Sequence, residues 1–184
     1  MAITYFGNNT DGTTSTSITD RIYWNNAELS GFTCPGSGSQ SVLELGVRCS
    51  ASGAANIRLA IYSTAGNLLM QGNAEMAAPD TAGWISHTSF VDYAGDPIIS
   101  PTLTGGTNYI LALTTDDEIA VRRDAGVTGD WHWYSGDETG GFAATLHSAN
   151  DTSGLYCVRC GVEPAAGGPS LLIIQHYNRM MRQD

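Results

Sequence analysis

Apolar and polar residues alternate with a period of two in several stretches of this chain. Apolar residues stand at every second position of residues 43–49 and again of residues 57–61. Because successive side chains of a strand point to opposite faces, this alternation predicts two β-strands, each with one buried face. Residues 63–67 have the composition of a turn, so residues 68–70 are expected to return as the second strand of a hairpin. The clearest strand prediction is for residues 108–114, Asn-Tyr-Ile-Leu-Ala-Leu-Thr.

Shorter apolar stretches recur along the rest of the chain, separated by segments rich in Gly and Asp. They are residues 82–85, 119–122, 130–134, 141–145 and 155–160. No stretch before residue 165 keeps a helical period. Many short strands joined by polar turns favour an antiparallel sandwich or barrel over alternating strand and helix units. The predicted fold class is therefore all-β.

The same pattern divides the chain into three parts. Residues 1–20 are mostly polar and rich in turn formers, and are expected to form an N-terminal arm or loop. Residues 21–163 contain the predicted strands and are expected to form the β-sandwich. Residues 164–184 begin with Pro-Ala-Ala-Gly-Gly-Pro, the composition of a flexible linker, and continue into an apolar C-terminal tail.

Several of the predicted strands and turns together resemble a known structural module. The runs that carry the resemblance are Asn56–Tyr62, Gly66–Leu69, Gly83–Trp84, Leu103–Thr107 and Tyr109–Leu113. They resemble a recurrent jelly-roll module that is similar to carbohydrate-binding domains and occurs in phage structural proteins and microbial surface proteins. The resemblance covers roughly residues 40–115. It implies an antiparallel jelly-roll-like β-sandwich, extended here by the N-terminal arm and the C-terminal tail, and it implies no particular ligand.

The charge of the chain argues against some classes of function. Its formal net charge is −10, and all eight basic residues are arginines, so the chain has no lysine. Such a surface repels a phosphate backbone, which argues against nucleic-acid binding. No apolar run approaches the roughly eighteen residues of a membrane-spanning helix, and the first residues lack the regions of a secretory signal. The expectation is an extracellular or virion-surface location without a visible signal peptide and without a membrane partner.

The C-terminal tail is the strongest functional clue in the sequence. Four consecutive aliphatic residues beyond a Gly-Gly-Pro break are unusual, and their burial would contribute up to ~6–12 kcal/mol before the cost of ordering the chain. The tail either packs on its own domain as a last strand or short helix, or lies on a neighbouring subunit by strand addition or groove binding. The second interpretation predicts these subunit contacts: Leu171, Leu172, Ile173, Ile174, Tyr177, Met180 and Met181.

An aromatic cluster is a second candidate site. On a strand, Trp131 and Trp133 would share one face, while His132 and Tyr134 would share the other. One exposed pair would form a flat platform on which a sugar ring stacks, so Trp131, Trp133 and Tyr134 are candidate glycan-binding residues. The more common alternative is that both tryptophans fill the sandwich core.

The four cysteines, Cys34, Cys49, Cys157 and Cys160, are candidates either for disulfides or for buried thiols. Cys157 and Cys160 have the spacing of half a zinc site. The other two cysteines lie too far apart in sequence to complete it, so no metal is predicted. Cys49 and Cys160 both have inward parity on predicted strands, which makes them candidate neighbours.

Acidic residues crowd the loops of one region, namely Asp116, Asp117, Glu118, Asp124, Asp130, Asp137 and Glu138. Paired carboxylates can hydrolyse glycosides, and loop carboxylates can hold calcium. No Asp-x-Asp-x-Asp-Gly series supports a structural calcium ion, and turn formation explains most of these residues. The four histidines lack metal-binding spacing, and no nucleophile elbow or phosphate-binding loop is present. The sequence therefore predicts no catalytic residue and no cofactor.

Two N-glycosylation sequons lie in polar stretches of the chain, at Asn8 and at Asn150. Both acceptors are expected to be accessible because loops are predicted around them. Sequons of this length also arise by chance, and a bacterial or phage host would not use them.

Together these features predict a non-catalytic structural protein that assembles into a virion or an extracellular filament through its terminal extensions. Such a protein would be a decoration, fibre or filament subunit, and its partners would be copies of itself or neighbouring subunits. The alternative is a carbohydrate-binding module that stacks glycans on exposed aromatic residues. A glycoside-active enzyme is the least supported interpretation.

Overall fold

The computed structural model describes residues 2–18, 21–25, 31–50, 55–134, 142–146 and 150–164, with the backbone alone for residues 25, 125–134 and 150–154. These residues form sixteen β-strands and no helix. The first eight strands are β1 Thr4–Gly7, β2 Thr14–Ile18, β3 Ile22–Asn25, β4 Phe32–Thr33, β5 Gly38–Cys49, β6 Asn56–Ser63, β7 Leu68–Gly72 and β8 Met76–Ala77. The others are β9 Gly83–His87, β10 Phe90–Val91, β11 Pro97–Ile98, β12 Thr102–Gly105, β13 Asn108–Thr115, β14 Ile119–Tyr134, β15 Asn150–Tyr156 and β16 Val158–Pro164.

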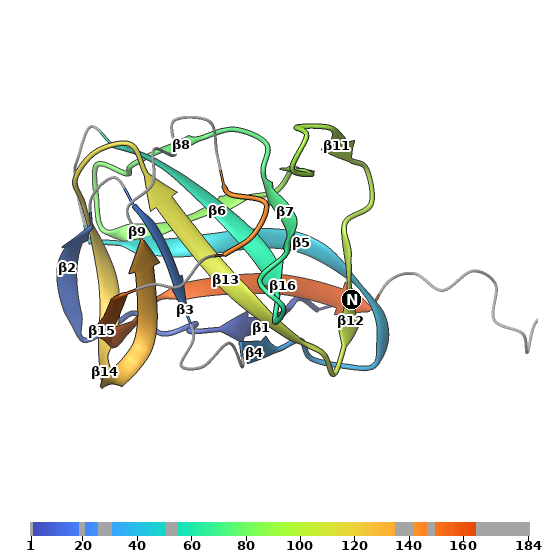
Figure 1. Ribbon diagram of the computed structural model, residues 1–184, viewed down its shortest axis with the longest axis horizontal. Coiled ribbons are helices and arrows are strands. Elements are labelled where there is room, and N and C mark those ends of the chain that lie inside the picture. Colours follow the sequence, from blue (N-terminus) through green and yellow to red (C-terminus); the bar gives the residue numbers. More distant parts are fainter. Residues whose placement is uncertain are drawn as a thin grey trace, which may run out of the picture.

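The strands pack as two antiparallel sheets of a β-sandwich (Figure 1). In the smaller sheet β1, β16 and β5 lie side by side, and β12 and β9 follow one another along the other edge of β5. In the larger sheet the order is β14, β3, β13, β6, β7, β10 and β11, with β2 and β15 on β14, β4 on β13 and β8 on β6. In the described part of the chain, one pairing, Val121 with Cys49, joins the two sheets. The predicted all-β antiparallel sandwich is confirmed.

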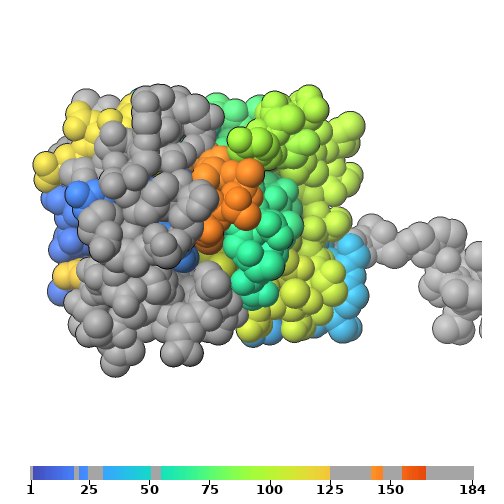
Figure 2. All heavy atoms as spheres, viewed as in Figure 1, coloured from blue at the N-terminus to red at the C-terminus, as the bar shows by residue number. Residues whose placement is uncertain are grey.

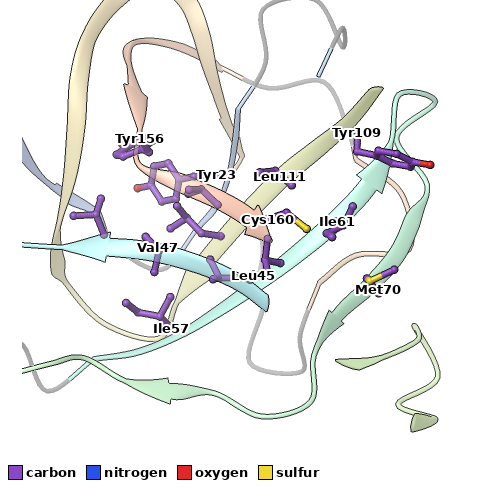
Figure 3. Packing of buried hydrophobic residues seen from close by; sticks show 14 of the residues in the cluster. Tyr23, Leu45, Val47, Ile57, Ile61, Met70, Tyr109, Leu111, Tyr156 and Cys160 are labelled. Atoms are coloured by element: carbon purple, nitrogen blue, oxygen red, sulfur yellow. The ribbon is translucent and has the colours of Figure 1, made fainter. Parts of the chain in front are cut away.

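The main core lies between the two sheets. Leu45 and Val47 face it from the smaller sheet, and Ile57, Ile61 and Leu111 face it from the larger one (Figure 3). All five side chains are fully buried. Because burial of each such side chain contributes about 1.5–3 kcal/mol, the alternation read from residues 57–61 identifies a principal source of stability.

A β-bulge changes the inward parity of β5 from the one that the sequence predicts. Leu43 was expected to face inward, but it is only partly buried, and Val42 takes the inward position. In the pairing with β16, Gly161 lies opposite Glu44 while the next residue, Val162, lies opposite Val42, so Leu43 has no partner. One unpaired residue moves every earlier side chain of the strand to the other face.

The larger sheet is also buried on its outer face. Ala60 and Tyr62 of β6, which alternate with the core residues, are fully buried there beside Trp24. The cover includes residues 142–146, drawn in orange in Figure 2, whose Phe142 packs edge-on against Tyr62 with ring centroids 6.2 Å apart. The sheet therefore has two apolar faces, where the alternation suggested one.

The covering segment is held by the hairpin turn between β6 and β7. The N–H of Leu68 donates to the Ala144 carbonyl, and the N–H of Leu146 donates to the Gly66 carbonyl. A strand was predicted for residues 141–145, but residues 142–146 make only one isolated bridge, between Thr145 and Asn67. The prediction of a strand is wrong for these residues, because the segment crosses the sheet face and does not extend its edge.

The N-terminal residues belong to the sandwich and differ in this from the predicted polar arm or loop. β1 pairs with β16, and β2 pairs with β14. Four of the five side chains of β2 are hydroxyls, and its one apolar residue, Ile18, is buried. Backbone pairing with β14 therefore explains this strand better than apolar alternation does.

The bounds of the later strands differ from those that the sequence pattern predicts. Residues 130–134 continue β14 and form no separate strand, and residues 155–160 are shared between β15 and β16. β16 ends at Pro164, which pairs with Gln40, and this places the end of the strand beside β12 and the start of β1 (Figure 1). The predicted linker and tail, residues 165–184, lie outside the described residues. No described helix is long and apolar enough to cross a membrane.

Candidate functional site

A cavity of about 410 Å³ opens at the end of the sandwich where β16 ends. β5, β7, β11, β12 and β13 each contribute to its wall. Its volume lies within the range of about 300–1,000 Å³ that ligand pockets occupy. The residues that line it carry no charge, and they are Ser39, Leu69, Met70, Ile98, Ser100, Thr102, Leu103, Thr104 and Tyr109.

Core residues close the inner side of this cavity. Met70, Leu103 and Tyr109 belong to the main core and are each less than a tenth exposed. Met70 and Tyr109 lie beyond Ile61 at one end of that core (Figure 3). The Tyr109 hydroxyl accepts a hydrogen bond from the Thr104 N–H at 2.8 Å, so its position is set within the protein. The floor of the cavity therefore consists of two apolar side chains and a tyrosine whose hydroxyl accepts one internal hydrogen bond.

Four exposed hydroxyl residues, Ser39, Ser100, Thr102 and Thr104, stand around this floor. A hydroxyl can donate and accept hydrogen bonds without carrying charge. No carboxylate, imidazole or thiol belongs to the lining. The cavity therefore combines polar and apolar surface and carries no charge.

Exposed aliphatic side chains gather around the same end. Ile99 lies directly between two lining residues and is 95% exposed, and Leu69, itself in the lining, is 37% exposed. Ile3, 43% exposed, does not belong to this group, because β1 lies on the edge of the smaller sheet opposite β12 and the Ile3 side chain is next to Gly161. Of the exposed large hydrophobic residues in the described part of the chain, Ile3 and Tyr93 have no such link to the lining. Exposed apolar groups that cluster in this way mark contact surfaces.

The two groups of binding residues predicted from the sequence are not tested by this geometry. The backbone of Trp131, Trp133 and Tyr134 lies in β14, between β3 and β15, but their side chains lie outside the described part. The glycan platform stays a prediction. The predicted subunit contacts, Leu171, Leu172, Ile173, Ile174, Tyr177, Met180 and Met181, also fall outside the described residues.

All four cysteines are buried free thiols, one of the two predicted alternatives. Cys160 lies opposite Leu45, whereas Cys49 lies four residues farther along β5, opposite Val121. Four strand residues span about 13 Å, while a disulfide joins Cα atoms at most about 7 Å apart. The predicted proximity of Cys49 and Cys160 is therefore wrong. Burial raises the pKa of every one of these thiols, to about 12 for Cys49, so they are protonated at neutral pH.

Asp124, one of the predicted loop carboxylates, ties the N-terminal segment to β14. It accepts hydrogen bonds from the Thr10 hydroxyl, from Asn8 Nδ2 at 3.1 Å and from the Thr13 N–H at 3.0 Å. The Thr10 bond contributes most to lowering the pKa of Asp124. This carboxylate is engaged in holding the fold together.

The other acidic residues also act locally where their side chains are described. Asp116 accepts from the backbone N–H and the side-chain amide of Asn56, at 2.6 and 2.7 Å, and these bonds lower its pKa. Asp117 accepts from the N–H of Glu118, the next residue. The side chains of Asp130, Asp137 and Glu138 lie outside the described part. Among the described residues, no group of three or more His, Cys, Asp or Glu side chains could hold a metal ion.

The two predicted glycosylation sites differ from expectation in their surroundings. Asn8 is 5% exposed, and its Nδ2, the atom that would carry a glycan, donates to Asp124 and to the Leu155 carbonyl. The prediction that Asn8 is accessible is wrong, because its segment is packed against β14 and β15. Asn150 begins β15 and does not lie in a loop, and its side chain lies outside the described part.

A stacked arginine on the smaller sheet was not predicted. The Arg159 guanidinium lies 4.2 Å from the centroid of the Tyr5 ring and 4.1 Å from that of Trp84, and it pairs with Glu44 at 3.1 Å. This cluster links β1, β16, β5 and β9. Its members are far apart in sequence, so only the strand order could have revealed it.

A buried histidine, His87, also has a role that its spacing did not indicate. β7 and β8 pair with β6 on either side of Arg58 and Leu59, which interrupts the ladder there. His87 reaches across from β9, and its Nε2 accepts the Leu59 N–H at 3.3 Å. Burial, followed by the charge of Arg58, lowers the pKa of His87 to about 4, so the ring is neutral at pH 7 as this acceptor role requires. A Cβ on Gly72 would lie 2.4 Å from the ring, so this close approach needs glycine.

Comparison of the chain with protein-family models, with curated proteins and with solved structures found no match.

Proposed function

We propose that the protein is a non-catalytic structural subunit that assembles with copies of itself, in a virion or an extracellular filament, through its C-terminal segment. One observation carries the proposal. The end of the sandwich at which β16 stops presents exposed aliphatic residues around an uncharged cavity. The chain beyond that point continues into the aliphatic run of residues 171–174. Residues 165–170 thus connect two sets of apolar residues, each of which would be stabilised by burial.

The charge of the molecule supports contact at this end over contact elsewhere. Copies with a formal net charge of −10 repel one another over most of their surface. The uncharged lining of the cavity is a place where such copies can approach, because burial of apolar area there brings no charge of the lining into the contact. The resemblance of residues 40–115 to a module of phage structural and microbial surface proteins supports the virion or extracellular setting.

The aliphatic run can be tested in the full chain. Replacing Leu171, Leu172, Ile173 and Ile174 together by Ser removes the apolar area and keeps the chain length. We expect the parent protein to form oligomers in sedimentation velocity and negative-stain images, and the variant to sediment as a monomer. The matched control is Gln175→Ala with Asn178→Ala, which alters the same segment without changing its aliphatic residues and should assemble normally.

Normal assembly of the tetra-Ser variant would show that the C-terminal segment does not drive association. A parent protein that stays monomeric across the micromolar range would overturn the proposal of self-assembly as a whole.

A further inference from the structure

We infer, building on the proposed function, that the cavity at the end of the sandwich is the receptor for residues 171–174 of a second copy of the chain. The inference goes beyond assembly through the tail because it names the surface that receives the tail. It rests on the chemistry of the cavity, on its place beside the end of β16 and on the distribution of charge.

The cavity offers apolar side chains to an aliphatic segment and sets no charge against it. Its floor is Met70, Leu103 and Tyr109, all buried core residues, and its hydroxyl rim is neutral. In an extended run, alternate side chains share one face, so Leu171 and Ile173 can enter the cavity together. The two remaining aliphatics of the run then meet the rim.

The rim shows what the occupant would cover. Leu69, which belongs to the lining, is 37% exposed, and Ile99, which lies in sequence between the lining residues Ile98 and Ser100, is almost fully exposed. Solvent exposure of such side chains is unfavourable, and an apolar segment laid across the mouth would bury both. A small polar ligand held inside the cavity would leave Ile99 in water.

The position of the cavity favours a segment from another copy. β16 runs toward this end, so the chain at Pro164 is directed out of the body (Figure 1). The six residues 165–170 can span at most about 20 Å, which is enough to cross to a neighbouring molecule in end contact. Each copy then offers a tail and a cavity at the same end, as a two-fold contact requires.

Charge complementarity supports the same occupant. Two of the eight arginines, Arg179 and Arg182, and one of the eighteen acidic residues, Asp184, lie beyond Pro164. The segment after Pro164 therefore has a formal charge of +1, and the rest of the chain has −11. A weakly basic segment is attracted to an acidic body, and it docks without burying a charge in the neutral cavity.

The first experiment breaks each half of the contact in a different full-length chain. The cavity variant carries Leu69→Asp and Ser100→Asp, both at exposed positions of the lining, and the tail variant carries Ser at positions 171–174. Tyr93→Asp is the control, because it places a carboxylate at an exposed apolar residue outside the cavity. We expect each of the two variants to associate more than tenfold more weakly than the parent protein, and the control to associate normally.

Mixing the two variants tests exchange between copies. The tail variant has an unaltered cavity and the cavity variant has an unaltered tail, so the mixture should form one-to-one pairs in sedimentation equilibrium. No pairs in the mixture would overturn the inference, because a tail that docks in its own cavity cannot rescue a partner. If the cavity variant assembles like the parent while the tail variant does not, the receptor lies elsewhere and the proposed function stands. If both assemble like the parent, the proposed function fails with the inference.

A second measurement does not depend on the stability of the charged variants. Full-length Ser100→Cys is mixed with full-length Ile173→Cys and oxidised, with Tyr93→Cys in place of Ser100→Cys as the control. The described native cysteines are buried, so an interchain disulfide in the first mixture reports contact between the tail of one chain and the cavity of another. A covalent dimer of the two variants on a non-reducing gel supports the inference. Equal crosslinking in the Tyr93→Cys control, or none in either mixture, overturns it.

Discussion

At the end of the sandwich formed by β2, β14 and β15, polar groups bond to one another, whereas at the end formed by β11 and β12 apolar groups face solvent (Figure 1). At the first end, which we call the bonded end, Asp124 accepts three hydrogen bonds from residues 8–13. Arg122 donates to the carbonyl oxygens of Asp11 and Gly12, at 3.0 and 2.6 Å. At the second, the open end, the cavity lining has no charged group and Ile99 is 95% exposed.

Under the proposed function, the difference predicts which end contributes to stability and which end receives another molecule. Charges at the bonded end are already paired with backbone and side-chain groups, so a partner there would compete with internal hydrogen bonds. Apolar groups at the open end have water as their alternative, so a partner there displaces water and breaks no internal bond. Substitutions should therefore change stability at the bonded end and association at the open end.

A pair of glycines gives the largest expected contrast. Gly12 at the bonded end and Gly38 at the open end have nearly equal φ angles, +69° and +68°. A Cβ on Gly12 would lie 2.9 Å from Arg122 Cβ, from the Arg123 N and from Cys157 Sγ, whereas a Cβ on Gly38 meets nothing within 4 Å. Gly12→Ala should lower the free energy of unfolding by about 4 kcal/mol, from backbone strain and crowding together.

Gly38→Ala is the matched control and should cost only about 1–2 kcal/mol, the strain of the left-handed backbone. Urea unfolding followed by tryptophan fluorescence measures both values. Equal losses at the two positions would show that the bonded end is no more tightly packed than the open one.

His87 lies in the sandwich between the two ends, and its contribution to stability can be tested by the pH dependence of unfolding. Above pH 6.5 the ring is neutral in the folded and unfolded chain, so it adds no pH dependence. As the pH falls from 6.5 to 4, the unfolded chain binds a proton that the folded chain excludes, because the pKa of the folded state is about 4. The free energy of unfolding should fall by about 3 kcal/mol over this window.

His87→Gln keeps an acceptor oxygen for the Leu59 N–H and removes the titration. Urea midpoints at pH 7 and pH 4.5 should differ clearly less in this variant than in the parent protein. The same pH slope in both proteins would mean that other groups, including Asp116 and Asp124 with their lowered pKa values, account for the acid sensitivity.

Asp124→Ala tests the bonded end through its hydrogen bonds. It removes the acceptor of three hydrogen bonds at once, which come from Asn8 Nδ2, the Thr10 hydroxyl and the Thr13 N–H. Asn8 Oδ1 and the Arg123 carbonyl remain as second acceptors for the two threonines, so the loss of the charge-assisted bonds should lower the free energy of unfolding by about 2 kcal/mol and not more.

Asp117→Ala removes a carboxylate whose hydrogen bond in the described part of the chain comes from the N–H of Glu118. It should lower the free energy of unfolding by less than about 0.5 kcal/mol. Thermal denaturation separates the two, and a loss at Asp117 as large as at Asp124 would remove the distinction between them.

The smallest effect on stability is expected at the open end. Ile99→Ser removes a side chain that is almost entirely in water, so the free energy of unfolding should change by less than about 0.5 kcal/mol. Association, measured by sedimentation, should weaken all the same. A large loss of stability with unchanged association would reverse the assignment of the two ends.

The core strands of the fold could be predicted because their signal is local. Residues 57–61 alternate and are buried as expected, and residues 108–114 lie in β13. The bulge at Leu43 could not be read from β5 alone, because it exists only in the pairing with β16. β2 escaped prediction for a similar reason, since a strand of hydroxyl residues has little apolar pattern of its own.

The candidate cavity could not be predicted from the sequence. Its lining joins residue 39 to residues 98–109 by the pairing of β12 with β5, and to residues 69–70 by packing across the sandwich. Leu69, Leu103, Thr104 and Tyr109 belong to the runs that carry the resemblance to a jelly-roll module, but that resemblance implies no ligand. The aliphatic tail, by contrast, was visible at once, because four adjacent apolar residues after a linker are a property of the sequence alone.

The rates at which the buried thiols react with a reagent report how often each end of the sandwich opens. Cys157 lies at the bonded end, where the Thr10 hydroxyl is 3.5 Å from its sulfur, and Cys34 lies at the open end, where its N–H donates to the Thr107 carbonyl. A thiol reagent reaches either sulfur only during moments when the surrounding structure opens. The labelling rates of Cys34 and Cys157, followed by mass spectrometry in native buffer, therefore compare how often the open end and the bonded end open. Occupation of the cavity by a partner should slow the first rate and leave the second unchanged.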